Sequence, residues 1–338
     1  MDTVSHASSG ALTGAVVAEL MLPSADISFV AIGLVAGLIP DIDFLAELKG
    51  KVAAWTMHRI VAHNVAVALL LATILAIIVW WLSSLPLIVV FSVCIAAASI
   101  HLLLDVLTSF GTCLLYPFNL RRFTTRSHFI FDPLVILLCI VGLLSSSPVL
   151  WMAALLIYLL FGVVVRYILT RWLSDRLSDL SGNHEVHLEP RFLAPFRWLI
   201  ILQTDSGYRY AYQSFFWRGP WYQQERHVSG DFDDELLDKV INACQSDKLL
   251  SAVLVTFDMP VYTLVNWQDA PYVIVEDLKW RLEPQLRPLA FTAIVTHDSA
   301  GAVSLDKVSQ GGFFQPDNQG IFNSGSLTPA ICKSGLNA

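Results

Sequence analysis

Two long stretches of this sequence are almost free of charge. Val65–Leu82 carries no charged residue, and neither does Leu85–Leu104 apart from His101. Each stretch is close to the roughly 20 apolar residues that cross the hydrocarbon core of a bilayer. We therefore expect this part of the chain to fold in lipid as a bundle of membrane helices.

Further apolar segments extend the bundle. Pro133–Val165 is also uncharged, but it is too long for one crossing, and the turn at 145–148 predicts a helical hairpin. Ala7–Leu22 and Ile27–Pro40 are apolar but shorter, so they are expected either as thin spans or as a half-inserted pair. The fold class predicted for residues 1–172 is an α-helical membrane bundle of about four to six membrane helices.

The basic residues predict how the bundle is oriented. Lys and Arg accumulate in cytoplasmic loops, and here they occur in alternate connections only. These residues are Lys49, Lys51, Arg59, Arg121, Arg122, Arg126, Arg166, Arg171 and Arg176. The pattern predicts six segments, with the N-terminus and the domain after the bundle both in the cytoplasm.

The chain after the bundle is more polar and holds most of the acidic residues behind the net charge of −7. We predict a polar linker at 173–191, a small cytoplasmic α+β domain at 192–308 and a disordered tail at 309–338. Alternation predicts strands around Tyr208–Tyr212 and at 251–257, 261–267 and 272–276, and Asp233–Cys244 has helical spacing. No basic stripe indicates a nucleic-acid partner.

Ionisable residues are costly within or against apolar helices, and here they form a set. Under the topology derived from Lys and Arg alone, every member falls at the cytoplasmic side of the bundle. The members are His6, Asp41, Asp43, His58, His63, His101, Asp105, His128 and Asp132.

Imidazole and carboxylate groups together favour a divalent metal, with zinc the first choice and manganese or iron as alternatives. One or two ions fit this number of ligands. His101 and Asp105 are four residues apart, so they share one helical face. Other interpretations stay open: the pair forms a buried ion pair, Asp132 only caps the helix that starts at Pro133, and the acids at 41 and 43 are solvated.

The motifs that carry these residues resemble the membrane-bound metal-dependent hydrolases, a family that includes LexA-regulated inner-membrane putative hydrolases of bacteria. The resemblance covers about the first 170 residues. The family form has Gly and Thr-His-Ser around the second histidine of the third motif, whereas this chain has Arg59-Ile60-Val61-Ala62-His63-Asn64. The matching pieces are MDTVSH, GLIPDIDF at 37–44, HRIVAHN at 58–64, HLLLDVLTSFGTCLLYPF at 101–118 and FDP at 131–133.

The resemblance implies a hydrolase in the bacterial inner membrane whose ligand-type positions are those of the set above without His128. The family is similar, more remotely, to zinc-dependent phospholipase C and P1-type nucleases, which use His-x3-Asp pairs like that of His101 and Asp105. We expect metal-activated water to attack an ester or phosphoester of a lipid or lipid-linked substrate, with Asp43 or Asp41 accepting a proton and Arg59 stabilising negative charge.

Two other functions fit the same residues. A regulatory or scaffold protein would hold a structural metal in closed coordination. A metal ion transporter also places charged residues among its helices. It would, however, need a second group of polar residues, deeper in the membrane or at its opposite side, in addition to the group predicted at the cytoplasmic side.

Overall fold

The computed structural model describes most of the chain in two compact units. The first unit contains the described residues up to Leu173 together with Leu188–Arg197, and the second contains Ser174–His187 and the chain from Trp198 onward. The described residues are 1–24, 26–42, 62–119, 121–181, 186–191, 194–203, 207–214, 220, 222–225, 227–229, 234–254, 257, 259–267, 270–278, 291–297 and 303–310.

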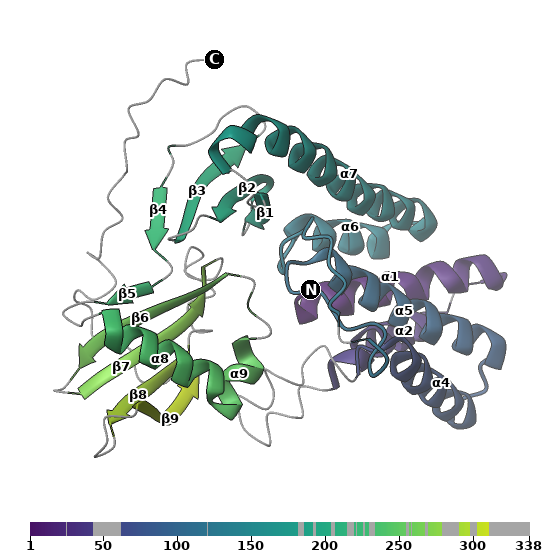
Figure 1. The fold of residues 1–338 in the computed structure, drawn as a ribbon. Coiled ribbons are helices and arrows are strands. Elements are labelled where there is room, and N and C mark those ends of the chain that lie inside the picture. Colours follow the sequence, from purple (N-terminus) through teal and green to yellow (C-terminus); the bar gives the residue numbers. More distant parts are fainter. Residues whose placement is uncertain are drawn as a thin grey trace. The chain divides into compact units, whose positions relative to one another are not determined.

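Up to residue 181, every element longer than an isolated β-bridge that the structure describes is a helix (Figure 1). Among these helices, α4, α5 and the Pro148–Arg176 part of α7 are long and apolar enough to cross a membrane. A helical membrane region is therefore confirmed, while the count of four to six spans stays a prediction. The helices are α1 (Thr3–Met21), α2 (Ser28–Leu38), α4 (Val65–Leu82), α5 (Leu87–Leu107), α6 (Pro133–Leu144) and α7 (Pro148–Ser181).

The helix ends follow local signals in the sequence. Asn64 caps α4 through its side-chain oxygen, which accepts a hydrogen bond from the Val67 amide at 3.1 Å. Asp132 caps α6 in the same way, and Pro133 takes the first helical position. The predicted hairpin break is confirmed, because α6 ends at Leu144 and α7 starts at Pro148.

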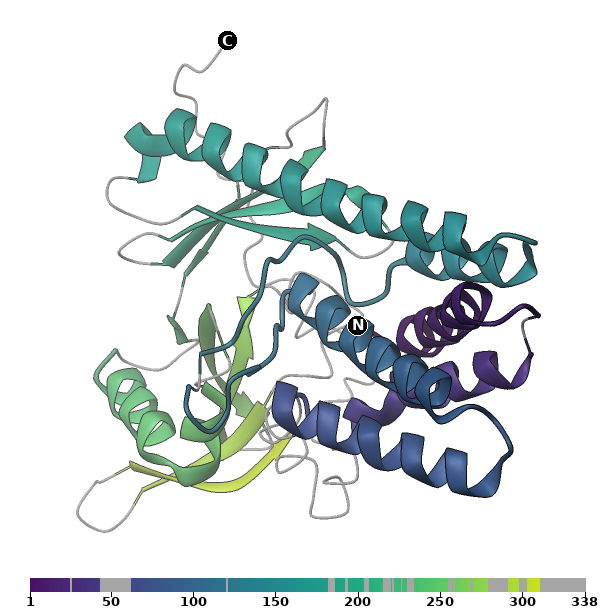
Figure 2. The ribbon, with the colours of Figure 1, turned by 90° about the vertical axis from the view of Figure 1, so that its right-hand side faces the viewer.

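Helix α1 lies at the centre of the first unit, against α2, α5 and α6 (Figure 2). One core cluster joins α1, α2, α4 and α5 through small side chains, including Ala72 and Ala76 of α4. A second cluster joins α1 to α5, α6 and α7 around Leu12. The opposite side of α4 exposes Ile77 and Trp81, as expected for a surface that faces lipid.

The connection between α5 and α6 folds back on itself. The backbone groups of Thr112 and Phe123 exchange two hydrogen bonds, of 3.1 and 2.9 Å. Gly111, directly before Thr112, has φ +60°, and a Cβ there would lie 2.6 Å from the Phe123 carbonyl oxygen. Arg126, further along, donates to Glu189 Oε1 at 3.0 Å within the first unit.

Regular structure continues through the segment predicted as a linker. Helix α7 extends to Ser181, because residues 174–181 are mostly polar but include no Pro or Gly that would end the helix, and β1 follows at Val186–Arg191. The described strands form a four-stranded sheet in the order β1-β2-β3-β4 and a five-stranded sheet in the order β5-β6-β7-β8-β9.

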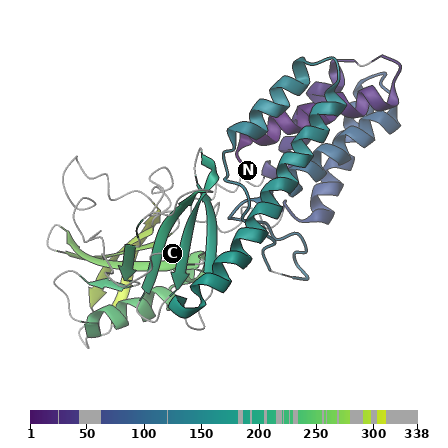
Figure 3. The same ribbon diagram turned by 90° about the horizontal axis from the view of Figure 1, so that it is seen from above.

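The second unit is rich in strands, as predicted. In the five-stranded sheet β5 is parallel to β6, and the other neighbours are antiparallel. Helix α8 packs against this sheet (Figures 1 and 3). The elements are β2 (Ala194–Gln203), β3 (Gly207–Ser214), β4 (Tyr222–Glu225), β5 (His227–Ser229), α8 (Asp234–Ser246), α9 (Lys248–Leu254), β6 (Pro260–Trp267), β7 (Ala270–Asp277), β8 (Phe291–His297) and β9 (Val303–Gln310).

One strand prediction in this unit is wrong. The apolar run that starts at Ser251 belongs to α9 and not to a strand. A short apolar run does not distinguish a strand from a buried helix by its periodicity. The deciding signal is Asp247, whose carboxylate accepts a hydrogen bond from the Leu250 amide at 2.9 Å and so caps α9. The tail predicted at 309–338 begins too early, because Ser309 and Gln310 are paired with β8 as the end of β9; the rest of it lies outside the described residues.

Replacing Leu12 with Ala should destabilise the first unit by about 2 to 5 kcal/mol. The side chain is fully buried where α1 packs against α6 and α7, and its loss leaves a cavity. Thermal unfolding in detergent measures the change. Leu20→Ala in the same helix is the matched control, since Leu20 is 68% exposed. Equal destabilisation by both variants would contradict the packing described here.

Candidate metal centre

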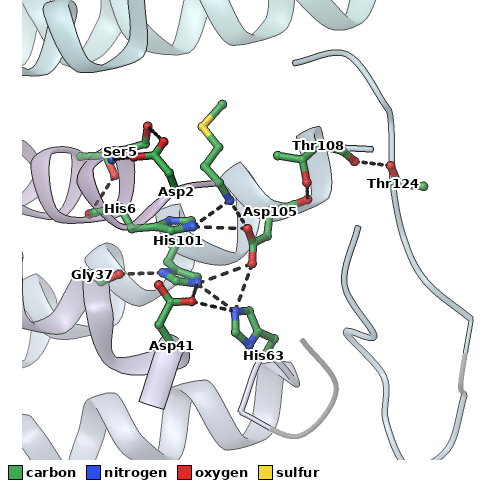
Figure 4. Close-up of polar contacts among 12 residues, drawn as sticks. Asp2, Ser5, His6, Gly37, Asp41, His63, His101, Asp105, Thr108 and Thr124 are labelled. Carbon is green, nitrogen blue, oxygen red and sulfur yellow. Dashed lines mark hydrogen bonds and ion pairs between the residues drawn. The ribbon is translucent and has the colours of Figure 1, made fainter. Parts of the chain in front are cut away.

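Five of the predicted ligand residues meet at one end of the first unit (Figure 4). They come from α1, from the turn after α2, from the residue before the cap of α4, and from α5. Four of them are completely buried, and Asp41 keeps 22% of its side chain exposed. The five residues, called the His/Asp cluster below, are His6, Asp41, His63, His101 and Asp105.

Helix α5 supplies a pair of donors, as its sequence predicts. His101 and Asp105 lie one helical turn apart, with 3.6 Å between His101 Nε2 and Asp105 Oδ2. His101 Nδ1 lies 2.7 Å from the carbonyl oxygen of Gly37, which can only accept a hydrogen bond. Nδ1 therefore carries the proton in neutral His101, and the lone pair of Nε2 points into the cluster.

His63 and Asp41 complete this side of the cluster. His63 precedes the Asn64 cap, so its ring is held at the start of α4. His63 Nε2 lies 3.1 Å from His101 Nε2, 3.1 Å from Asp105 Oδ2 and 3.4 Å from Asp41 Oδ1. Asp41 Oδ1 is also 3.7 Å from His101 Nε2.

These spacings fit the ligand shell of a small divalent cation. Four ligands at zinc's bond lengths in tetrahedral geometry lie about 3.3 Å from one another. The five distances measured among the donor atoms of Asp41, His63, His101 and Asp105 range from 3.1 to 3.7 Å. Lone pairs this close repel, so a proton or a cation is required among them. The donor types and these five distances fit zinc.

Asp105 presents its second oxygen to another donor. Its Oδ1 lies 3.3 Å from His6 Nε2, whereas Oδ2 faces His63 and His101. The Met1 amino group contacts the same Oδ1 and lies 2.8 Å from His6 Nε2. The His6 ring stacks on the His101 ring with 3.6 Å between centroids. A carboxylate used in this way can bridge two ions.

The structure places the other described candidates in different surroundings. Asp132 caps α6 and accepts a hydrogen bond from the Tyr158 hydroxyl at 2.7 Å, which matches the capping interpretation of its sequence. His128 Nδ1 lies 2.9 Å from Ser127 Oγ, and the His128 ring packs against Tyr158. Their described contacts do not include the His/Asp cluster. Asp43, His58 and Arg59 lie outside the described residues.

Two residues that support the cluster were not predicted. Gly37 contributes a backbone carbonyl, and a side-chain motif search cannot find such a group. Asn64 donates from its amide to the Tyr116 carbonyl and so ties the residue beside His63 to the loop after α5. Its position directly before an apolar helix is a capping signal that would have revealed part of this role.

The family comparison covers the same region of the chain. A family model described as YdjM inner membrane protein matches residues 1–173, which include every member of the His/Asp cluster. No curated protein and no solved structure matches the chain significantly.

Replacing His63 with Ala should remove bound zinc, because this imidazole lies within 3.4 Å of three other donor atoms. Elemental analysis of the purified full-length protein measures the effect. Asp132→Asn is the matched control, since it also alters a buried polar residue but leaves the cluster intact. Loss of zinc from Asp132→Asn would restore Asp132 as a candidate ligand.

His128 should make the folded protein acid-sensitive. Burial lowers the pKa of His128 from 6.5 to about 4. Below pH 6.5 the unfolded chain takes up a proton at this residue that the folded chain does not, so stability falls as the pH drops from 6.5 toward 4. The free energy of unfolding of His128→Asn should decline less over this interval than that of wild type. Parallel pH profiles would contradict this origin of the acid sensitivity.

Proposed function

The chain belongs to the YdjM inner membrane protein family, and we propose that this member is a membrane-bound, metal-dependent hydrolase of ester or phosphoester bonds. The observation that carries the proposal is the meeting of Asp41, His63, His101 and Asp105, where five donor-to-donor distances lie between 3.1 and 3.7 Å. Two imidazoles and two carboxylates form a donor set suited to zinc, and also to manganese or iron.

An open side of the cluster supports catalysis over a purely structural metal. Catalytic zinc sites keep one position for water or substrate, whereas structural sites are closed by four protein ligands. Asp41 is the partly exposed member of the cluster, so solvent approaches the donors from its side. If the bond between the Asp41 carboxylate and a bound ion were long or exchangeable, His63, His101 and Asp105 would be the three protein ligands.

The chemistry divides between the ion and the chain. Zinc bound at these residues would lower the pKa of its water toward neutrality and so supply hydroxide for attack on phosphorus or a carbonyl carbon. Asp41 is placed to accept the proton of that water, because its carboxylate is the exposed one. Asp105 fixes the centre through Oδ2 and holds His6 through Oδ1, an arrangement that also suits a second ion. Asp43 and Arg59 remain proposed proton acceptor and charge-stabilising group.

The surroundings favour an amphiphilic substrate. The cluster lies at the ends of apolar helices, where the head group of a lipid would meet the aqueous phase. The basic residues of alternate connections support six membrane segments, with this end of the bundle and the second unit in the cytoplasm. We therefore propose a phospholipid or a lipid-linked phosphate as substrate and the cytoplasmic face of the inner membrane as its location.

A regulatory membrane protein with a structural metal is the second candidate. Complete burial of His6, His63, His101 and Asp105 favours it, because closed sites exclude water. A metal transporter is less well supported. The two groups of possible metal ligands found among the described residues both contain His101. That part of the chain therefore holds no separate second binding site for a permeating ion.

Purified full-length protein in mixed micelles should release the head group or the phosphate from a lipid phosphoester in a zinc-dependent manner. Dialysis against a chelator should abolish turnover, and added zinc should restore it. Asp105→Asn should lower turnover by at least about a hundredfold, because it removes the negative charge of the carboxylate that contacts His6 on one side and His63 and His101 on the other.

His128→Asn is the control for this assay, because His128 is buried but has no described contact with the cluster. Zinc bound in a closed site, with no turnover on lipid phosphoesters or carboxylic esters, would favour the structural alternative. Zinc uptake into sealed proteoliposomes would favour transport.

A further inference from the structure

Gly37 contacts the His/Asp cluster through its backbone. It lies in the last turn of α2, and Pro40, three residues further along, has no backbone N–H to donate to the Gly37 carbonyl oxygen. Its carbonyl oxygen instead accepts a hydrogen bond of 2.7 Å from His101 Nδ1, which lies 64 residues away in the sequence and is completely buried. In metalloproteins such a partner on the second ring nitrogen fixes the tautomer and the orientation of a ligating histidine.

The missing side chain of Gly37 also sets the position of α1. A Cβ at Gly37 would lie 2.8 Å from the His6 carbonyl oxygen and 2.9 Å from Gly10 Cα. Any larger residue would therefore push the α1 backbone away at His6 itself. His6 in turn stacks on His101 and faces Asp105 Oδ1.

The close contact of the two helices continues away from the cluster. Gly10 and Gly14 of α1 face Gly33 and Gly37 of α2 at four-residue spacing, and a Cβ at Gly14 would lie 2.0 Å from the Phe29 carbonyl oxygen. Small residues at this spacing let two helix backbones approach in a membrane. The Gly14 end of the contact lies two turns of α1 from His6, so it provides a comparison for packing alone.

We propose that Gly37 is a positioning residue of the metal centre: its carbonyl directs His101 Nε2 toward the ion, and its lack of a side chain brings His6 to the same place. This inference rests on the proposed function, because it assumes that the His/Asp cluster binds a metal. It assigns a role in metal affinity to a residue that has no ligand atom of its own.

The test compares Gly37→Ala with Gly14→Ala in the full-length protein in detergent. Zinc affinity is measured by competition with a chromophoric chelator, and the melting temperature is measured alongside. Gly37→Ala should weaken zinc binding by about 10- to 100-fold, the usual effect of losing a partner behind a metal ligand. Gly14→Ala should lower the melting temperature at least as much, because its Cβ meets backbone at a shorter distance, but it should keep wild-type affinity.

Equal losses of affinity in the two variants, or unchanged affinity in Gly37→Ala, would overturn the positioning role while leaving the proposed function intact. Absence of zinc binding by wild type would overturn both. A measurement on wild type decides the matter if Gly37→Ala does not fold. In zinc-loaded protein with ¹⁵N-labelled histidine, the His101 signal, assigned by its loss in His101→Asn, should show protonated Nδ1 and metal-bound Nε2. An unprotonated Nδ1 would contradict the role of the Gly37 carbonyl.

Discussion

The arrangement of the first unit depends on how buried imidazole and carboxylate groups are neutralised. Ionisable groups inside an apolar bundle are strongly destabilising unless they are paired or bind a metal. Asp105 satisfies this condition by contacting the Met1 amino group and His6 with one oxygen and His63 and His101 with the other. Three segments of the chain must therefore meet around one carboxylate, and the helices that carry them are held at fixed depths relative to one another.

The close approach of α1 and α2 makes this meeting possible. Glycines at the contact remove the side chains that would otherwise separate the two backbones. Larger apolar residues, such as Leu12, then fill the opposite side of α1 against α6 and α7. One helix thus combines a backbone contact on one side with ordinary side-chain packing on the other, and His6 lies near its start.

The sequence predicted what depends on periodicity and local chemistry. The apolar runs located α4 and α5, and the four-residue spacing placed His101 beside Asp105. The same reasoning could not decide between ligand and cap for Asp132, because both roles require a carboxylate before Pro133, and the structure shows the cap. It also could not find the Gly37 carbonyl, since every residue has one and only the tertiary fold selects which one meets His101. At α9, the capping role of Asp247 outweighed an apolar pattern that also fits a strand.

The distribution of the donors along the chain has a consequence for biogenesis. His6, Asp41 and His63 leave the ribosome before His101 and Asp105, and none of the earlier segments alone presents the four donors measured here. A metal centre built from these donors could therefore form only after α5 has packed against α1 and α2. Metal loading would then report that the bundle has assembled correctly, and a chain stalled before α5 would expose unneutralised histidines and acids to membrane quality control.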